Sequence, residues 1–101
     1  LEADLILQKI PSDSYIILCD MTGEKMSSRD LSKLFEKLMH QNLKICFVIG
    51  GSFGIYESIK KISNKVLSAS NFTFPHRLFR IILVEQIYRA ISIINNAPYH
   101  K

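Results

Sequence analysis

The chain has 101 residues, of which 48 % are hydrophobic and 22 % charged, with a formal net charge of +4 and a pI near 9.2. This composition is typical of one globular domain and excludes a disordered chain. The modest positive charge permits a polyanionic partner but does not by itself indicate one. No apolar run could span a bilayer and no signal peptide is visible, so we expect a single cytoplasmic domain over residues 1–101.

The first half of the chain predicts two helices with a strand between them. Residues 1–10 have apolar side chains at helical spacing, and Pro11 ends that helix. Residues 15–19 are expected to form a buried strand, and residues 20–25, which include Gly23, a loop. A second helix begins after Ser27, because Ser27 and Asp30 have the spacing of an N-terminal capping pair. Its inward face is expected to contain Leu31, Leu34, Phe35, Leu38 and Met39.

The next elements predict the architecture. Residues 44–49 are rich in strand formers and are followed directly by glycines. A short helix is then expected to carry Tyr56, Ile59 and Ile62 inward, and Val66 and Leu67 indicate a third strand. Strands that alternate with helices predict an α/β fold with a largely parallel sheet. Such sheets bind ligands beyond the carboxyl ends of their strands, so the loops after the second and third strands are candidate binding segments.

The last predicted helix, from about Pro75 to Ile94, is apolar around most of its circumference. A surface helix needs one apolar stripe, whereas this helix needs two covering surfaces. We expect a second copy of the chain to supply one of them, in a homodimer. The alternative is a central core helix in a monomer.

The cysteines and histidines do not suggest a metal centre. Cys19 and Cys46 lie in apolar strands and are expected to be reduced core thiols. The three histidines are far apart in sequence, so no metal-ligand spacing is present.

Two loops carry groups that could hold a ligand. Gly50 and Gly51 let the backbone approach a ligand closely, although their spacing matches neither a Walker loop nor a dinucleotide fingerprint. A plain tight turn is the alternative. Residues 68–74 offer amides, carbonyls and hydroxyls that could hold the edge of an adenine. Here the alternative is an ordinary loop with two core phenylalanines.

Basic residues follow this second loop and also end the chain. His76 and Arg77 fall in the first turn of a helix, where cations oppose the helix dipole, so a docked anion would explain them. We hypothesise an RNA phosphate near His76, Arg77 and Arg80; a solvated basic end is the alternative. The terminal Tyr99-His100-Lys101 could supply donors or a base, or could simply be a frayed end.

Four motifs occur in a specific order. They are Phe47-Val48-Ile49-Gly50-Gly51 with Gly54, then Leu67-Ser68-Ala69-Ser70 leading to Thr73-Phe74-Pro75-His76, then Glu85-Gln86-Ile87-Tyr88-Arg89-Ala90, and finally Pro98-Tyr99-His100. Together they closely resemble the RlmH-type pseudouridine N3-methyltransferases of bacterial large-subunit ribosomal RNA. The resemblance covers essentially the whole chain.

The resemblance implies a SPOUT-type α/β fold with a C-terminal trefoil knot, a homodimer, and large-subunit rRNA or the assembled ribosome as substrate. The implied cofactor is S-adenosylmethionine, whose methyl group would be transferred to N3 of a pseudouridine. By position, the cofactor-binding residues would be Cys19, Gly50, Gly51, Ala69, Ser70, Asn71, Phe72, Thr73 and Phe74. We hypothesise that Tyr99, His100 and Lys101 carry the chemistry and that no metal takes part.

The chain departs from the family pattern in a few places. Cys19 stands where Leu is usual, Phe72 and Phe74 replace Met or Leu, and Lys101 replaces Arg, keeping the charge but losing its bidentate fork. The family's opening strand and helix do not appear before Leu1, so a truncated, non-catalytic relative that dimerises and binds RNA or cofactor is the alternative. A nucleotide-dependent oxidoreductase is disfavoured, because the glycine fingerprint is absent.

Overall fold

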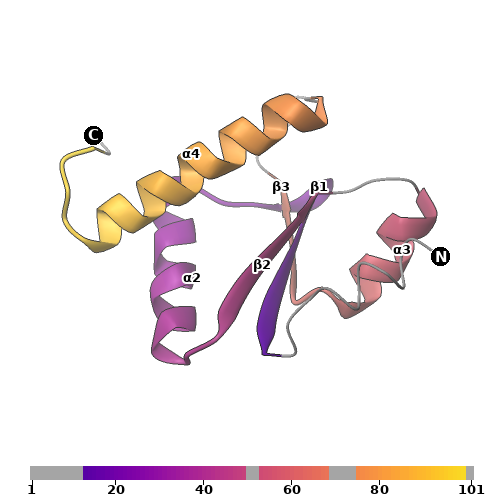
Figure 1. The fold of residues 1–101 in the computed structure, drawn as a ribbon, viewed down its shortest axis with the longest axis horizontal. Helices are drawn as coiled ribbons and strands as arrows, with labels where there is room; N and C mark the ends of the chain where they lie inside the picture. Colours follow the sequence, from indigo (N-terminus) through magenta and orange to yellow (C-terminus); the bar gives the residue numbers. More distant parts are fainter. Residues whose placement is uncertain (1–12, 50–52, 69–74, 100–101) are drawn as a thin grey trace.

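The computed structural model describes residues 13–49, 53–68 and 75–99 (Figure 1). The elements in chain order are β1 (Ser14–Lys25), α2 (Ser28–His40), β2 (Lys44–Ile49), α3 (Phe53–Ile62), β3 (Lys65–Ser68) and α4 (His76–Ile94). The described strands form one parallel sheet in the order β2-β1-β3. This confirms the predicted α/β class. The helix predicted for residues 1–10 lies outside the described residues, and the trefoil knot stays a prediction.

Helices lie on both sides of the sheet. Helices α2 and α4 pack together on one side, and α3 lies on the other (Figure 1). In the parallel pair β1 and β2, Ile17 is aligned with Phe47. Ile17 and Leu18 are completely buried, which makes β1 the centre of the core.

A compact apolar cluster joins α2, α4 and β2. Leu31, Phe35 and Ala90 are buried in it, and Phe47 packs edge-on against Phe35 with ring centroids 6.0 Å apart. The predicted inward positions Leu31, Phe35 and Leu38 are therefore confirmed. Met39 is 50 % exposed, so its predicted inward position is wrong. It lies about 80° around the helix from Leu31, at the edge of the covered stripe.

The predicted start of α2 is confirmed by a reciprocal cap. The backbone N–H of Asp30 donates to Ser27 Oγ at 3.0 Å, and the backbone N–H of Ser27 donates to Asp30 Oδ2 at 3.2 Å. These bonds satisfy two N–H groups that the helix itself leaves unpaired. The hydrogen bond from the Ser27 backbone lowers the pKa of the Asp30 carboxyl.

The predicted loop over residues 20–25 is wrong, because β1 continues to Lys25. The pairing with β3 shifts between Cys19 and Glu24, so that both residues are aligned with Leu67. Gly23 lies inside this irregularity. A Cβ on Gly23 would fall 2.6 Å from the backbone carbonyl carbon and oxygen of Val66. Glycine is therefore needed here for a close approach of two strands and not for a turn.

Helix α3 is held in place by its buried side and by the hydrogen bonds of the turn that follows it. Ile59 is completely buried, as predicted, but Ile62 is 42 % exposed, which corrects its predicted inward position. The helix ends at Ile62, and Asn64 then takes over the contact with β1. Its side-chain Oδ1 accepts from Ile16 N at 2.8 Å, and its own N–H donates to Ile16 O at 2.8 Å. The side chain of Tyr56 lies outside the described residues.

Candidate functional site

Strands β2 and β3 both end at one edge of the sheet, on either side of β1. Cys19 is aligned with Ile49 on β2 and with Leu67 on β3. Strand β2 ends at Ile49 and β3 at Ser68, so the segments 50–52 and 69–74 both start from this edge. This edge is where open parallel sheets bind ligands. The predicted cofactor residues in these two segments (Gly50, Gly51, Ala69, Ser70, Asn71, Phe72, Thr73 and Phe74) lie outside the described residues.

Cys19 is the predicted cofactor residue that the structure describes. It is buried, with no disulfide partner, and burial raises the pKa of its thiol to about 12. The group is therefore a neutral thiol at physiological pH and a weak nucleophile. Both Cys19 and Cys46 are free, which confirms the predicted reduced thiols, although Cys46 is only half-buried.

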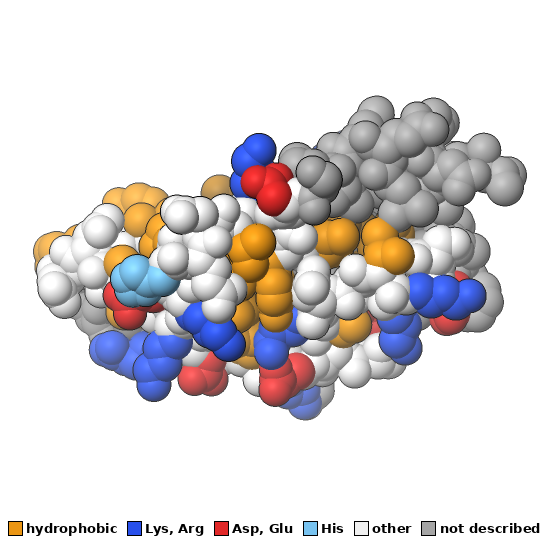
Figure 2. All heavy atoms as spheres, turned by 90° about the horizontal axis from the view of Figure 1, so that it is seen from below, with side chains coloured by type: hydrophobic (Ala, Val, Ile, Leu, Met, Phe, Trp, Pro, Cys, Tyr) orange, Lys and Arg blue, Asp and Glu red, His pale blue; other side chains and the backbone are white. Residues whose placement is uncertain are grey.

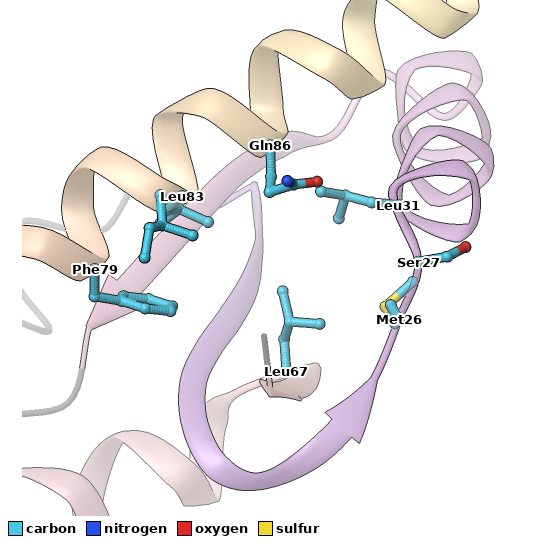
Figure 3. A pocket seen from close by; sticks show the side chains of 8 residues that line it. Met26, Ser27, Leu31, Leu67, Phe79, Leu83 and Gln86 are labelled. Atoms are coloured by element: carbon cyan, nitrogen blue, oxygen red, sulfur yellow. The ribbon is translucent and has the colours of Figure 1, made fainter. Parts of the chain in front are cut away.

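A small hollow of about 100 Å³ lies beside this edge, between β3, α4 and the start of α2. Figure 3 shows that its lining side chains converge from three elements far apart in sequence. They are Met26, Ser27, Leu31, Leu67, Phe79, Ile82, Leu83 and Gln86. The walls are mainly apolar, with the Ser27 hydroxyl and the Gln86 amide as polar groups. This combination is typical of small-molecule sites.

The sequence did not predict this hollow. Cys19 is not among its lining residues, and the residues that do line it had been interpreted as core or as a helix cap. One signal was available: Gln86, together with Glu85, interrupts the apolar sequence of α4.

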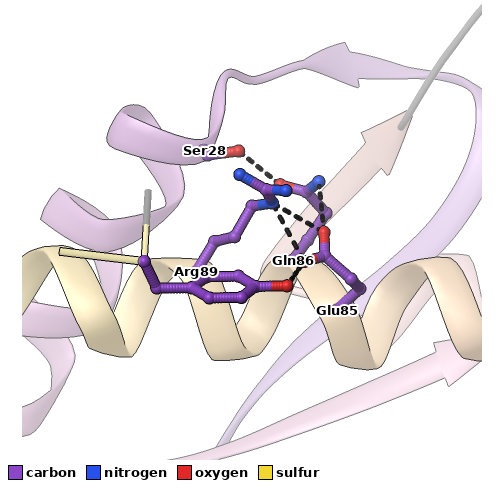
Figure 4. Close-up of polar contacts among 5 residues, drawn as sticks. Ser28, Glu85, Gln86 and Arg89 are labelled. Atoms are coloured by element: carbon purple, nitrogen blue, oxygen red, sulfur yellow. Dashed lines mark hydrogen bonds and ion pairs between the residues drawn. The ribbon is translucent and has the colours of Figure 1, made fainter. Parts of the chain in front are cut away.

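Polar side chains form a connected cluster along α4 (Figure 4). Arg89 Nε donates to both carboxylate oxygens of Glu85, at 2.7 and 3.0 Å, as their spacing of four residues on a helix favours. The Gln86 amide donates to Glu85 Oε1 at 3.4 Å and accepts a hydrogen bond from the Ser28 hydroxyl. Tyr99 Oη donates to Glu85 Oε2 at 2.7 Å. The pair of Glu85 and Arg89 is thus part of a network that reaches α2 and the C-terminal segment.

The predicted RNA-binding residues lie at the start of α4. Pro75 is the residue before the helix and makes no side-chain cap, and the first turn contains no acidic residue. Arg77 and Arg80 are exposed there, while the side chain of His76 lies outside the described residues. Elsewhere the charges are mixed: on the face in Figure 2, Lys and Arg side chains are interspersed with Asp and Glu. Surface charge therefore does not mark an RNA-binding site on this face.

An apolar stripe runs along the outside of α4. It consists of Leu78, Ile81, Val84, Tyr88 and Ile91, whose exposed fractions range from 45 to 67 %. The spacing of three or four residues places all five on one side of the helix. The opposite side of α4 is covered by α2. Of the two apolar sides of this helix, one is therefore packed against α2 and the other is exposed.

Residues 13–49, 53–68 and 75–99 contain no group of three or more His, Cys, Asp or Glu side chains arranged to hold a metal ion. Among the same residues, no helix is long and apolar enough to cross a membrane.

Comparison with known proteins relates this edge and its loops to a family. A family model described as "Predicted SPOUT methyltransferase" matches residues 1–100. The chain is 48 % identical to a ribosomal RNA large subunit methyltransferase H of Clostridium botulinum (strain Eklund 17B / Type B), over 99 % of this chain and 64 % of that protein. It is also 48 % identical to the protein of that name from Finegoldia magna, with the same coverage. A third such protein, from Dictyoglomus thermophilum, is 47 % identical over 98 % of this chain and 65 % of its own length.

The chain thus spans just under two thirds of the length of the curated relatives that it matches. The match nevertheless extends through all described elements and through both segments that start from the strand ends. This chain belongs to the SPOUT methyltransferase family.

Proposed function

We propose that this chain forms the catalytic part of an S-adenosylmethionine-dependent methyltransferase that acts on N3 of a pseudouridine in large-subunit ribosomal RNA. The observation that carries the proposal is the 48 % identity, over 99 % of the chain, to proteins named ribosomal RNA large subunit methyltransferase H. The geometry supports it, because the ends of β2 and β3 and a mainly apolar hollow lie at the edge where open parallel sheets bind ligands.

Two features of the described residues support a methyl donor bound at this edge. The hollow offers apolar walls with two polar groups, which suits the mixed surface of a nucleoside. The Cys19 thiol is held neutral by burial, so it does not compete with the substrate as a nucleophile. When bound, S-adenosylmethionine would supply an activated methyl group. The glycine segment 50–52 and residues 69–74 would hold it together with Cys19.

The reaction requires the chain to align the substrate and to manage one proton. N3 of the uracil-type ring carries a proton that must leave, so a base or a group that stabilises the anion is needed. We assign these tasks to His100 and Tyr99, which would act with Lys101 from the C-terminal tail of one subunit near the cofactor of the other. Arg77, Arg80 and His76 would bind RNA phosphates at the start of α4.

We further propose that the protein acts as a homodimer whose interface includes the apolar stripe of α4. Water-exposed stripes of this size and spacing commonly mark association surfaces. Val84→Glu is expected to shift the sedimentation coefficient from that of a dimer to that of a monomer. Ile62→Glu places the same charge on an exposed apolar residue of α3 and is expected to leave the dimer unchanged. Dissociation by both variants, or by neither, would contradict the proposed interface.

The function is tested by titration with S-adenosylmethionine, followed by methylation of ribosomes that lack the modification. Saturable binding and transfer of a labelled methyl group to one pseudouridine are expected. Arg77→Ala should weaken ribosome binding and reduce its salt dependence, whereas Lys61→Ala, which removes one charge from α3, should do neither. Cofactor binding without methylation of any ribosomal particle would favour the non-catalytic alternative.

A further inference from the structure

The chain turns back on itself after α4. Asn95 closes the helix, and Asn96 has a φ of 56°, in the left-handed region that asparagine tolerates. The N–H of Ala97 then donates to Ser92 O at 2.8 Å. This reversal brings Tyr99 alongside Glu85, fourteen residues earlier in the chain.

Three side chains of α4 hold the Tyr99 ring. Glu85 Oε2 accepts its hydroxyl at 2.7 Å, and the Arg89 guanidinium lies 5.1 Å from its ring centroid. Tyr88 packs edge-on against it with centroids 4.6 Å apart. Tyr99 is nevertheless 45 % exposed, so these contacts, and not burial in a core, determine where the ring lies.

Glu85 is the common partner in this arrangement. Its carboxylate binds the Tyr99 hydroxyl and the Arg89 side chain, and Arg89 in turn covers the ring. Gln86 links the same carboxylate to Ser28 on α2, and Gln86 also lines the hollow. The network that attaches the C-terminal segment therefore includes Gln86, a residue of the wall of this hollow.

The protonation of Tyr99 agrees with an anchoring role. Its hydrogen bond to Glu85 raises the pKa of the phenol, because the carboxylate stabilises the protonated donor. A phenol that donates to a carboxylate is a poor general base. Within the tail, the proton-transfer task then belongs to the next residues along the chain.

We propose that Glu85 is a positioning residue that fixes the C-terminal tail through Tyr99 and so delivers His100 and Lys101 to the methyl-transfer reaction. This inference rests on the proposed function and assigns different roles to the residues of the C-terminal tail. Tyr99 anchors, and the two residues after it act on the substrate. Small errors in the placement of reacting groups cost about 100-fold in rate, so loss of the anchor should affect turnover far more than binding.

The test uses the full chain with Glu85→Ala, Glu85→Gln and Tyr99→Phe. Glu36→Ala, which removes an exposed carboxylate from α2, is the matched control. Amide hydrogen exchange of residues 97–101 reports the anchor without requiring activity. Calorimetric affinity for S-adenosylmethionine and the separate kcat and KM for ribosomes report the chemistry. Tyr99→Phe removes a single hydroxyl outside any helix, so it keeps the test valid if a Glu85 variant folds poorly.

We expect Glu85→Ala to accelerate tail exchange by about tenfold and to lower kcat by about 10 to 100-fold, with KM and cofactor affinity within about threefold of wild type. Glu85→Gln keeps an acceptor for Tyr99 but loses the charge pair with Arg89, so it should fall between Glu85→Ala and wild type. Tyr99→Phe should behave like Glu85→Ala, and Glu36→Ala like wild type.

Two outcomes would overturn the inference: tail exchange that is unchanged in Glu85→Ala and Tyr99→Phe, or a released tail with full turnover. A wild-type chain that methylates no ribosomal particle, while its tail is protected and Glu85→Ala releases it, would contradict the proposed function and still support the Glu85 anchor.

Discussion

Replacing Gly23 with alanine is expected to destabilise the protein, although strand propensity predicts the opposite. In an unobstructed strand, alanine is favoured over glycine by about 0.5–1 kcal/mol, because glycine loses more backbone entropy on folding. Here the new Cβ would lie 2.6 Å from the carbonyl carbon and oxygen of Val66 and 2.7 Å from the N of Leu67. All three contacts are backbone atoms of β3.

The clash cannot be relieved by a side-chain rotation. Strand β3 would have to retreat by roughly 0.8 Å to restore an ordinary contact of 3.4 Å, and it is held in register with β1 on both sides of the irregularity. Overpacking of this kind typically costs about 1–3 kcal/mol, which exceeds the propensity gain. We therefore expect a net loss of about 1–2 kcal/mol, or roughly 4–16 °C in melting temperature for a domain of this size.

Thermal and urea unfolding of wild type, Gly23→Ala and Gly23→Val measure this effect. Valine has the highest strand propensity of the three residues and the largest side chain, so propensity and steric overlap predict opposite orders. The structure predicts that stability falls from glycine to alanine to valine. A Gly23→Ala variant that melts at or above the wild-type temperature would refute the reasoning, as would a valine variant more stable than the alanine variant.

Three further predictions follow from the core, the cap and the strand edge. Phe35→Ala should lower the free energy of unfolding by about 3–5 kcal/mol in urea denaturation, because it empties the centre of the cluster between α2, α4 and β2; a loss below about 1 kcal/mol would contradict that packing. The Asp30 carboxyl has a pKa below its ordinary value of 3.8, so its contribution is present above pH 3.8 and is lost as the pH falls through the folded-state pKa. Asp30→Asn should therefore be less stable than wild type at pH 7, with a stability difference that shrinks as the pH falls below 3.8 in a series of thermal melts. A stability difference that does not depend on pH would exclude the charged cap. The Cys19 thiol, whose pKa is raised to about 12 from 9.0, should react with iodoacetamide at pH 8 roughly 1,000 times more slowly than an ordinary thiol. Mass spectrometry of the alkylated protein measures this, and equal labelling of Cys19 in the native and urea-unfolded chain would show that the burial is incorrect.

Short sequence patterns predicted most helices and strands correctly, because these elements depend mainly on residues that are neighbours in sequence. The capping pair of Ser27 and Asp30 marked the start of α2, and the apolar runs marked the three described strands. The salt bridge between Glu85 and Arg89 followed from their spacing alone. The motif order also indicated the family to which the chain belongs.

The covered and exposed sides of α4 could not be assigned from local sequence patterns. Its composition showed that two apolar surfaces exist, but composition cannot tell which side α2 covers. That choice depends on the register of Ala90 against Leu31 and Phe35, which come from a helix almost sixty residues away in sequence. The open stripe through Val84 is what remains after that packing.

By itself, the sequence determined the α/β class, the helix starts and the membership of a methyltransferase family, since each rests on residue types at short spacing or in a fixed order. Only the tertiary structure decided that Gly23 is a point of strand contact, that Ile62 faces solvent, and that Tyr99 folds back onto Glu85. The physical reason is the same in all three cases. Each depends on the distance between segments that are remote in the chain, and that distance is determined by how the elements pack.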